Sequence, residues 1–445
     1  MAENLYISFL GTGNYGEVSY FPIENDSEKC ITNRFIQVAV SELYCRPSWG
    51  SNYRSLVLCT QDAEKKHWND LCPQLTNPEL ISIGEPYDIN AMWELFAQIS
   101  ELVGEHDKII FDITHSFRHI PMLLTIQIQY LMQIKKIELK GVYYGNFEAR
   151  DRSQAPPRAP IIDLSPMFSL YQWTTAIHLF EHAGISDDLC ELTQDKISPI
   201  LRETRGQDEN AQALRGLTKT IQEFTRAVQS VRSLDLVEPH PARLDDSRAR
   251  RIGIDYDRAI KKPLEGIAEN FIRPLAPVLS QLRDTFKPFK TGDAMNILYA
   301  ANWARQHGQI QSAYTLLQEG CITILSRHFD SELIEILGTQ ATELEKRKAM
   351  STAIHSQRTN RQTTNAGYKP EVYTKLQELG RKIKEVCPDL ISNFDILTQR
   401  RNDLNHAGSG TDNPAHYESF VKDFERLYDG CSENIGRLQR KGVSL

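Results

Sequence analysis

The stretch KIIFDITHSFRHIP, residues 108–121, decides the fold of the first part of this chain. Residues 108–113 are a short apolar run of the kind that forms a buried strand, and a helical pattern follows over 121–134. Hydroxyl, imidazole and guanidinium groups therefore gather where a strand ends and a helix begins, which is where anions bind. We expect a ligand site formed by Thr114, His115, Ser116 and Arg118.

An ordinary helix start is the competing interpretation of this stretch. Thr114 or Ser116 would then be the N-cap, and the other residues a solvated loop. Capping accounts for one hydroxyl, but it gives no role to two histidines and an arginine beside it. The carboxyl ends of parallel strands are also the usual ligand sites of open sheets. We therefore favour ligand binding.

Three similar apolar runs surround this stretch, at residues 5–10, 55–60 and 138–144, and a helical pattern covers residues 89–103. Short apolar runs separated by helices indicate a mostly parallel sheet covered on both faces. The sequence thus predicts an α/β, Rossmann-like N-terminal domain. A proline-rich break at residues 155–160 is expected to close it.

A glycine-rich turn, GTGNYG at residues 11–16, follows the first apolar run and fits the dinucleotide pattern G-x-G-x-x-G. That pattern requires a helix to open at the last glycine. Residues 17–23 look extended instead, which argues against a nicotinamide site. A turn whose backbone N–H groups approach a phosphate or an adenine is still expected. The candidate ligand residues here are Gly11, Thr12, Gly13 and Asn14, and the strand-end segment YYGNFE, residues 143–148, adds Tyr144 and Gly145 and an aromatic face to close the pocket.

The rest of the chain has helical periodicity, at residues 168–183, 210–236, 293–337, 371–386, 390–406 and 414–438. A charged stretch at 238–257 and an Asn/Thr/Gln-rich stretch at 352–369 are expected to be loops. The predicted domains are 1–160, a sheet domain; 161–290, a helical linker region; and 291–445, an all-α domain.

Composition restricts the class of protein. The chain has 445 residues, 40% of them hydrophobic, and a formal charge of −7, so any contact with nucleic acid must be local. Its eight cysteines are scattered without a Cys-x2-Cys pair, which argues against zinc and for reduced thiols in the cytosol. We find no signal peptide and no apolar stretch long enough to span a membrane. A cytoplasmic protein without membrane contact is expected.

The hexapeptide RNDLNH, residues 401–406, carries the candidate catalytic residues Arg401, Asn402 and His406. Cleavage of RNA through its own 2′-hydroxyl needs a group that moves protons near neutral pH and a fixed cation beside the phosphate. Arg401 shares one helix face with Phe394, Leu397 and Leu404, which directs it toward an interface. A solvated helix face, or an arginine in a structural ion pair, is the alternative. No Asp/Glu/His cluster with metal-ligand spacing accompanies the motif, so we expect neither a metal nor a cofactor.

The segments LYISFLGTGNYG, FDITHSFRHIP, VYYGNFEA and RNDLNH together resemble the CRISPR-associated ribonucleases of type III systems. These proteins join an N-terminal CARF (CRISPR-associated Rossmann fold) domain to a C-terminal HEPN nuclease domain. DITHSFRHIP is similar to the family's Asp-x-Thr-His-Gly motif, with Ser116 in place of the glycine, and residues 302–325 are similar to the opening helices of a HEPN domain.

The resemblance implies a homodimer or higher oligomer in which a cyclic oligoadenylate, with four adenylates preferred, binds between two CARF domains. Binding activates metal-independent cleavage of single-stranded RNA by paired HEPN domains, giving 2′,3′-cyclic phosphate ends. Two alternatives remain open. In the first, the chain is a ligand-gated regulatory module that does not cut RNA. In the second, the chain is a nuclease whose CARF site also cleaves its own activator.

Overall fold

The computed structural model describes residues 2–23, 29–85, 87–115, 119–237, 254, 256, 282–357, 367–410 and 414–440. They divide into two compact units, residues 1–171 and 172–445. Two sequence predictions fall largely outside the described residues. These are the loop at 238–257, of which only Ile254 and Tyr256 are described, and the central part of the loop at 352–369.

An eight-stranded mixed sheet in the order β3-β2-β8-β7-β6-β1-β4-β5 forms the centre of the first unit. The five strands from β7 to β5 in this order run parallel, whereas β8 is antiparallel to β7 and β3 is antiparallel to β2. This confirms the mostly parallel Rossmann-like sheet. The strands are β1 (Asn4–Leu10), β2 (Val18–Pro22), β3 (Ile31–Asn33), β4 (Arg54–Cys59), β5 (Pro78–Ser82), β6 (Lys108–Asp112), β7 (Glu138–Gly145) and β8 (Arg158–Asp163).

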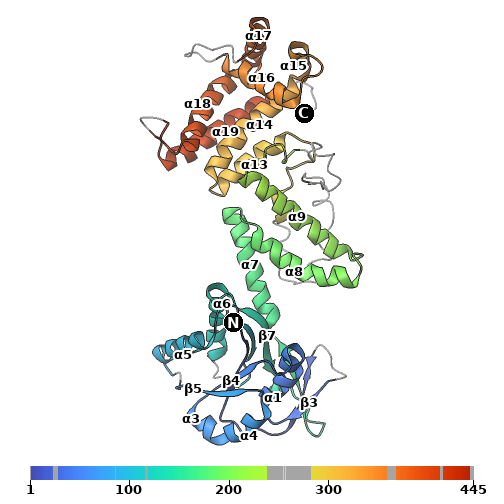
Figure 1. Cartoon of the computed structure of the whole chain (residues 1–445), viewed down its shortest axis with the longest axis vertical. Coiled ribbons are helices and arrows are strands. Elements are labelled where there is room, and N and C mark those ends of the chain that lie inside the picture. The colour runs from blue at the N-terminus through green and yellow to red at the C-terminus, as the bar shows by residue number, and fades with distance from the viewer. Residues whose placement is uncertain are drawn as a thin grey trace. The chain divides into compact units, whose positions relative to one another are not determined.

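Both faces of this sheet are buried, because successive side chains of a strand point to opposite faces. In β1, Leu5, Ile7 and Phe9 pack in one apolar cluster with α5 (Ile89–Leu102) and α6 (Ile120–Ile134). Tyr6 and Leu10 pack in a second cluster on the other face, which is covered by α1 (Ile36–Val40), α2 (Arg46–Trp49), α3 (Gln61–Ala63) and α4 (Asn69–Leu71) (Figure 1). This double burial explains why the strands appear as continuous apolar runs in the sequence.

The expected end of the sheet domain at the proline-rich break was wrong. Residues 158–163 form β8, which pairs with β2 and β7, so the sheet continues beyond residue 160. Pro160 is tolerated in this strand because it is needed only as an acceptor, and its carbonyl accepts a hydrogen bond of 2.9 Å from Asn146 N–H. Strand β2 agrees with the extended conformation expected for residues 17–23, whereas sequence periodicity missed the short strands β3 and β5.

The second unit is helical in its described residues, as expected. Residues 161–290 do not form a separate compact unit, because α8 and α9 belong to the same unit as the later helices. The predicted helical segment 293–337 is divided into three helices, and α8 and α16 were not predicted. The helices from the unit boundary onward are α7 (Ser165–Ala183), α8 (Asp187–Glu203), α9 (Glu209–Gln229), α13 (Met295–Gln306), α14 (Ile310–His328), α15 (Asp330–Leu337), α16 (Glu343–His355), α17 (Pro370–Val386), α18 (Pro388–Asn405) and α19 (Tyr417–Arg440).

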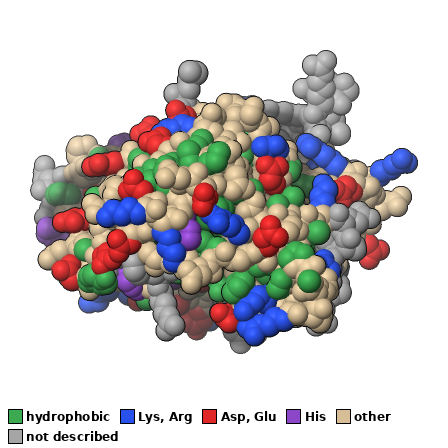
Figure 2. Space-filling view, turned by 90° about the horizontal axis from the view of Figure 1, so that it is seen from below, with side chains coloured by type: hydrophobic (Ala, Val, Ile, Leu, Met, Phe, Trp, Pro, Cys, Tyr) green, Lys and Arg blue, Asp and Glu red, His purple; other side chains and the backbone are tan. Residues whose placement is uncertain are grey.

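Surface charge and hydropathy agree with the composition. Basic and acidic side chains are interspersed on the face seen from below in Figure 2, as expected for a chain with a formal charge of −7. None of the helices that the structure describes is long and apolar enough to cross a membrane.

Candidate functional site

Asp112, the last residue of β6, is a fully buried carboxylate at the carboxyl end of the parallel strands. Its Oδ1 accepts a hydrogen bond of 2.9 Å from Thr114 N–H and a second one from the Thr114 hydroxyl. That hydroxyl in turn accepts 2.8 Å from Gly145 N–H at the end of β7. Burial raises the pKa of Asp112 to about 6, although the bonds from Thr114 oppose this rise. Thr114 therefore ties the ends of two neighbouring strands together.

His115 follows directly and lies against an aromatic side chain from the glycine-rich turn. Its ring centroid is 4.6 Å from that of Tyr15, and Tyr15 lies at the same distance from His67 on its other side. Burial, with a smaller contribution from His67, lowers the pKa of His115 to about 4, so its imidazole is neutral at pH 7. His115 Nε2 is buried without a hydrogen-bond partner among the described residues. A ligand atom is a natural partner for it.

The glycine-rich turn is held in place by a distant helical segment. Lys66 Nζ donates to the Thr12 carbonyl (2.7 Å) and to Asn14 Oδ1 (2.8 Å), and His67 Nε2 donates to the Gly13 carbonyl (2.8 Å). The Tyr15 hydroxyl closes the turn on itself, since it accepts from Gly11 N–H and donates to the Gly11 carbonyl. The chain leaves the turn as strand β2, which confirms that no dinucleotide-type helix begins at Gly16.

These groups surround a pocket of about 190 Å³ beyond the ends of β1 and β4. Of the predicted ligand residues, Gly11, Thr12 and His115 line it. Thr114 and Gly145 brace the adjoining strand ends, and Gly13 and Asn14 anchor the turn. Ser116 and Arg118 lie outside the described residues. The pocket is lined by Phe9, Leu10, Gly11, Thr12, Leu58, Thr60, Ile83 and His115.

The competing interpretation of Thr114 as a helix cap is excluded, because helix α6 begins at Ile120 with His119 as its N-cap and no side-chain cap. The aromatic face expected from residues 143–148 is absent from the described pocket lining, and Tyr144 is half-buried outside it. Tyr143 instead stacks on Tyr44 beneath the sheet, with ring centroids 3.7 Å apart. The aromatic ring beside His115 is Tyr15. Neither Tyr15 nor its neighbours Lys66 and His67 were predicted to be site residues, because the two segments meet only in the fold.

The second candidate site lies at the end of α18, whose core face is formed by Phe394 and Leu397. The helix ends in a Schellman arrangement, in which Gly408 N–H donates to the Asp403 carbonyl (3.0 Å) and Ala407 N–H to the Leu404 carbonyl (3.2 Å). His406 is therefore the C-cap of the helix. Asn402 and His406 are exposed one turn apart, as the spacing predicted.

The two adjacent arginines of α18 have different surroundings. Arg400 is paired with Asp423 of α19 at 2.6 Å and also lies over the Phe420 ring. Arg401 is half-buried, makes no ion pair with any described residue, and has a buried Nε without a partner. Arg400 is thus the structural ion-pair partner, and Arg401 is left available for an anion. Within the described residues, no group of three or more His, Cys, Asp or Glu side chains could hold a metal ion.

Comparison with known proteins identifies a segment of the first unit. Residues 58–148, which include the ends of β4, β6 and β7, match the family model "CRISPR system endoribonuclease Csx1, CARF domain". This segment belongs to a CRISPR-associated CARF domain. The predicted resemblance is therefore confirmed over this segment, which contributes Leu58, Thr60, Ile83 and His115 to the strand-end pocket.

Two further likenesses were found. The chain is 33% identical over 116 residues to the CRISPR-associated protein MJ1674 of Methanocaldococcus jannaschii, which is 25% of this chain and only 18% of that protein. The structure of Enterococcus italicus Csm6 bound to cyclic hexa-2′-fluoro-hexa-dAMP is 10% identical, with a TM-score of 0.47 over 100% of this chain and 96% of that one. A likeness this weak assigns neither ligand nor activity to this chain.

The buried carboxyl gives a pH prediction for the CARF domain. Asp112→Asn removes the titrating group but keeps Oδ1 as the acceptor for Thr114. The folded pKa of about 6 lies above the ordinary 3.8, so the folded state binds the proton more tightly and stability falls as pH rises. Relative to Asp112→Asn, the parent should lose about 3 kcal/mol between about pH 4 and pH 7. Hydrogen exchange of β1 and β6 peptides, with both proteins compared at each pH, measures this difference. A difference that does not change with pH would contradict a buried, titrating Asp112.

Proposed function

We propose that this protein is a cyclic-oligoadenylate-activated endoribonuclease that cuts single-stranded RNA without a metal ion. The observation that carries the proposal is the half-buried Arg401, which has no ion-pair partner among the described residues, beside the exposed Asn402 and His406 on the same chain as a CARF domain. A CARF pocket alone fits a sensor, and an Arg-x4-His helix alone fits many surfaces. Their combination fits a sensor that controls an RNA-cleaving site.

The proposed chemistry uses only side chains of the motif. A histidine accepts the proton of the RNA 2′-hydroxyl, whose oxygen attacks the adjacent phosphorus, and a second histidine protonates the departing 5′-oxygen. The products are a 2′,3′-cyclic phosphate and a 5′-hydroxyl. The Arg401 guanidinium stabilises the charge that develops on the phosphoryl oxygens. One motif has a single histidine, so two copies around a two-fold axis give the complete set.

An exposed apolar surface on the CARF domain supports a homodimer. Met122, Ile126 and Ile134 form a stripe along α6, with 75%, 59% and 61% of their surfaces exposed, and Trp93 on α5 is 60% exposed. Because large exposed apolar patches mark interaction sites, these helices are suited to pack against a second copy of themselves. The cyclic activator then lies on the axis between two CARF pockets, and it activates by binding the active arrangement more tightly than the resting one. Four adenylates remain our preferred ring size.

Cleavage of the activator within the CARF site is a second candidate function. His115 is neutral at pH 7 and lines the pocket with Thr12 and Thr60, and its Nε2 has no described partner. A neutral imidazole can accept a proton from a ribose hydroxyl, although the lowered pKa makes His115 a weaker base than an ordinary histidine. Incubation of the protein with the cyclic oligoadenylate alone, followed by chromatography of the products, tests this function.

Changes in the Arg-x4-His motif should abolish RNA cleavage. Arg401→Ala and His406→Ala should each lower the cleavage rate at least roughly a hundredfold, because each removes a proton-transfer or charge-stabilising group. Binding of the activator should be unchanged. Arg381→Ala on α17 and His182→Ala on α7 are matched controls on exposed side chains and should cut like the parent. Full activity in both motif variants would place the nuclease site elsewhere.

Chelation should leave cleavage intact. The motif offers an arginine and an imidazole for charge stabilisation and proton transfer, so the rate in EDTA should equal the rate in Mg²⁺ within about twofold. A gel assay with end-labelled single-stranded RNA measures both rates. Complete loss in EDTA with recovery in Mg²⁺ or Mn²⁺ would contradict the proposed mechanism.

Activator binding should depend on the contacts that hold the glycine-rich turn. Lys66→Ala removes the two hydrogen bonds to Thr12 and Asn14, and His115→Ala removes a ring from the pocket. Each should weaken cyclic oligoadenylate binding by roughly tenfold or more, since stacking on an adenine contributes about 1–3 kcal/mol. Lys65→Ala is the matched control, because the adjacent Lys65 is exposed. Calorimetric titration measures the affinities. Binding as tight as that of the parent in both variants would show that this pocket does not recognise the activator.

A further inference from the structure

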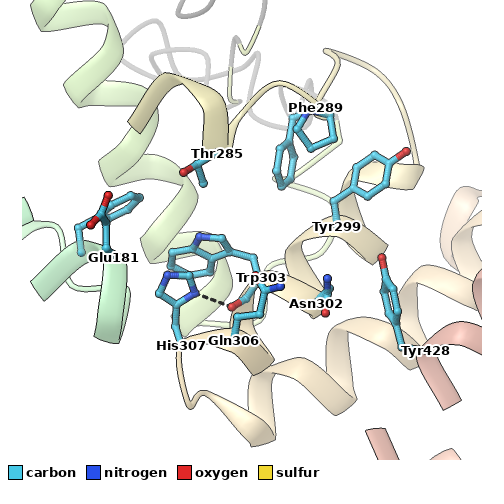
Figure 3. Close-up of a pocket in the computed structure, with 11 residues that line it drawn as sticks. Glu181, Thr285, Phe289, Tyr299, Asn302, Trp303, Gln306, His307 and Tyr428 are labelled. Atoms are coloured by element: carbon cyan, nitrogen blue, oxygen red, sulfur yellow. Dashed lines mark hydrogen bonds between the residues drawn. The ribbon is translucent and has the colours of Figure 1, made fainter. Parts of the chain in front are cut away.

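The helical unit contains a pocket that is separate from the Arg-x4-His motif. Its volume is about 340 Å³, within the range of about 300–1,000 Å³ typical of small-molecule sites. Four segments form it, namely the end of α7, residues 285–289, α13 with the residue that follows it, and α19. Figure 3 shows its lining residues, which are Phe180, Glu181, Thr285, Pro288, Phe289, Tyr299, Asn302, Trp303, Gln306, His307 and Tyr428.

Aromatic rings form a rigid wall of this pocket. Trp303 is 6% exposed and is covered on one face by His307, with ring centroids 3.9 Å apart. His307 is fixed in turn, because its Nδ1 donates to the Trp303 carbonyl at 2.6 Å (Figure 3). Phe289 packs edge-on against Tyr299 at 5.8 Å. Rings held by packing in this way give a stacking surface that loses little freedom when a planar ligand binds.

Three side chains of the pocket have polar groups without a partner among the described residues, namely Asn302, Gln306 and Trp303. Asn302 and Gln306 lie one turn apart on α13, and their side-chain amides make no hydrogen bond to a described residue. Trp303 Nε1 is buried and also has no partner, which is a costly arrangement unless a ligand accepts its hydrogen. The described lining residues include one carboxylate, Glu181, and no lysine or arginine. A phosphate is therefore disfavoured, whereas a planar base with an amino group fits.

The pocket lies near the proposed nuclease motif along the chain. Helix α13 ends at Gln306, and α14 begins four residues later. Gln311 on α14 donates to Asn405 Oδ1, within the motif, at 3.2 Å. The five residues from Gln306 to Gln311 span at most roughly 18 Å, so the pocket edge and the motif are separated by no more than a short length of RNA.

We propose that this pocket binds an adenine base of the RNA substrate and so sets a base preference near the cut. The inference rests on the proposed nuclease function for its substrate. The adenine ring stacks within the aromatic wall, and the Asn302 and Gln306 amides contact its N6 amino group and N7, as side-chain amides do when they recognise adenine.

Equilibrium binding of fluorescent oligouridine RNA, with or without one central adenosine, tests this pocket. The full-length His406→Ala protein is used so that the RNA is not consumed. The adenosine should tighten binding roughly fivefold to a hundredfold. Asn302→Ala combined with Gln306→Ala should bring that ratio to about one, and Trp303→Phe, which keeps an aromatic ring but removes Nε1, should lower it. Gln222→Ala on α9, outside the pocket, should keep the ratio of the parent.

Equal affinity for the two RNAs, or an adenosine preference that persists in the double variant, would contradict the proposal that this pocket binds adenine. Cleavage of the same RNAs by the parent separates this result from failure of the nuclease proposal. If the parent cuts both RNAs without an adenosine preference, the nuclease proposal holds and the adenine pocket is contradicted. If the protein prefers the adenosine RNA but does not cut it, the adenine pocket holds and the nuclease proposal is contradicted.

Discussion

The buried Asp112 carboxylate is the interaction on which the CARF site depends. A charge at this depth is costly unless it is hydrogen-bonded, and Thr114 supplies both a backbone and a hydroxyl donor. The same hydroxyl accepts from Gly145, so one threonine fixes the ends of β6 and β7. His115, the next residue, is thereby placed at the mouth of the pocket and against Tyr15. The carboxylate therefore positions a ligand-facing residue that it does not contact itself.

The helical unit separates structural from functional charge in a similar way. The Arg400 guanidinium forms an ion pair with Asp423 and lies over the Phe420 ring, and these contacts hold α18 against α19. This leaves Arg401 without an ion pair in the described structure, and the Schellman turn places His406 at the helix end, one turn beyond Asn402. A phosphate bound here meets a preorganised cation, which is the condition for electrostatic stabilisation without a metal. Because each Arg-x4-His motif has one histidine, the proposed mechanism requires a second copy of the chain.

The sequence predicted most reliably those segments whose local residue pattern matches their burial in the folded protein. Strands β1, β4, β6 and β7 are buried on both faces, so their continuous apolar runs identified them, and the Arg-x4-His spacing placed Asn402 and His406 correctly. Strand β8 was missed because the prolines in and just before it suggested a break. Pro160 fits the strand because only its carbonyl takes part in backbone hydrogen bonding. The contacts of Lys66 and His67 with the glycine-rich turn join segments about fifty residues apart. Such contacts arise from the strand order and leave no local signal. Arg401 also lacks an ion pair in the described structure because Arg400 pairs with Asp423 instead. Only the packing of α18 on α19 decides which of the two arginines meets Asp423.

Coupling between the CARF pocket and RNA cleavage is the central claim. The most direct measurement is the initial rate of single-stranded RNA cleavage in EDTA, with no activator and with cyclic tri-, tetra-, penta- and hexa-adenylate in turn. The account predicts a low basal rate and strong activation by one ring size, with the tetra-adenylate preferred. An equal rate under all five conditions, or no cleavage under any, would contradict it.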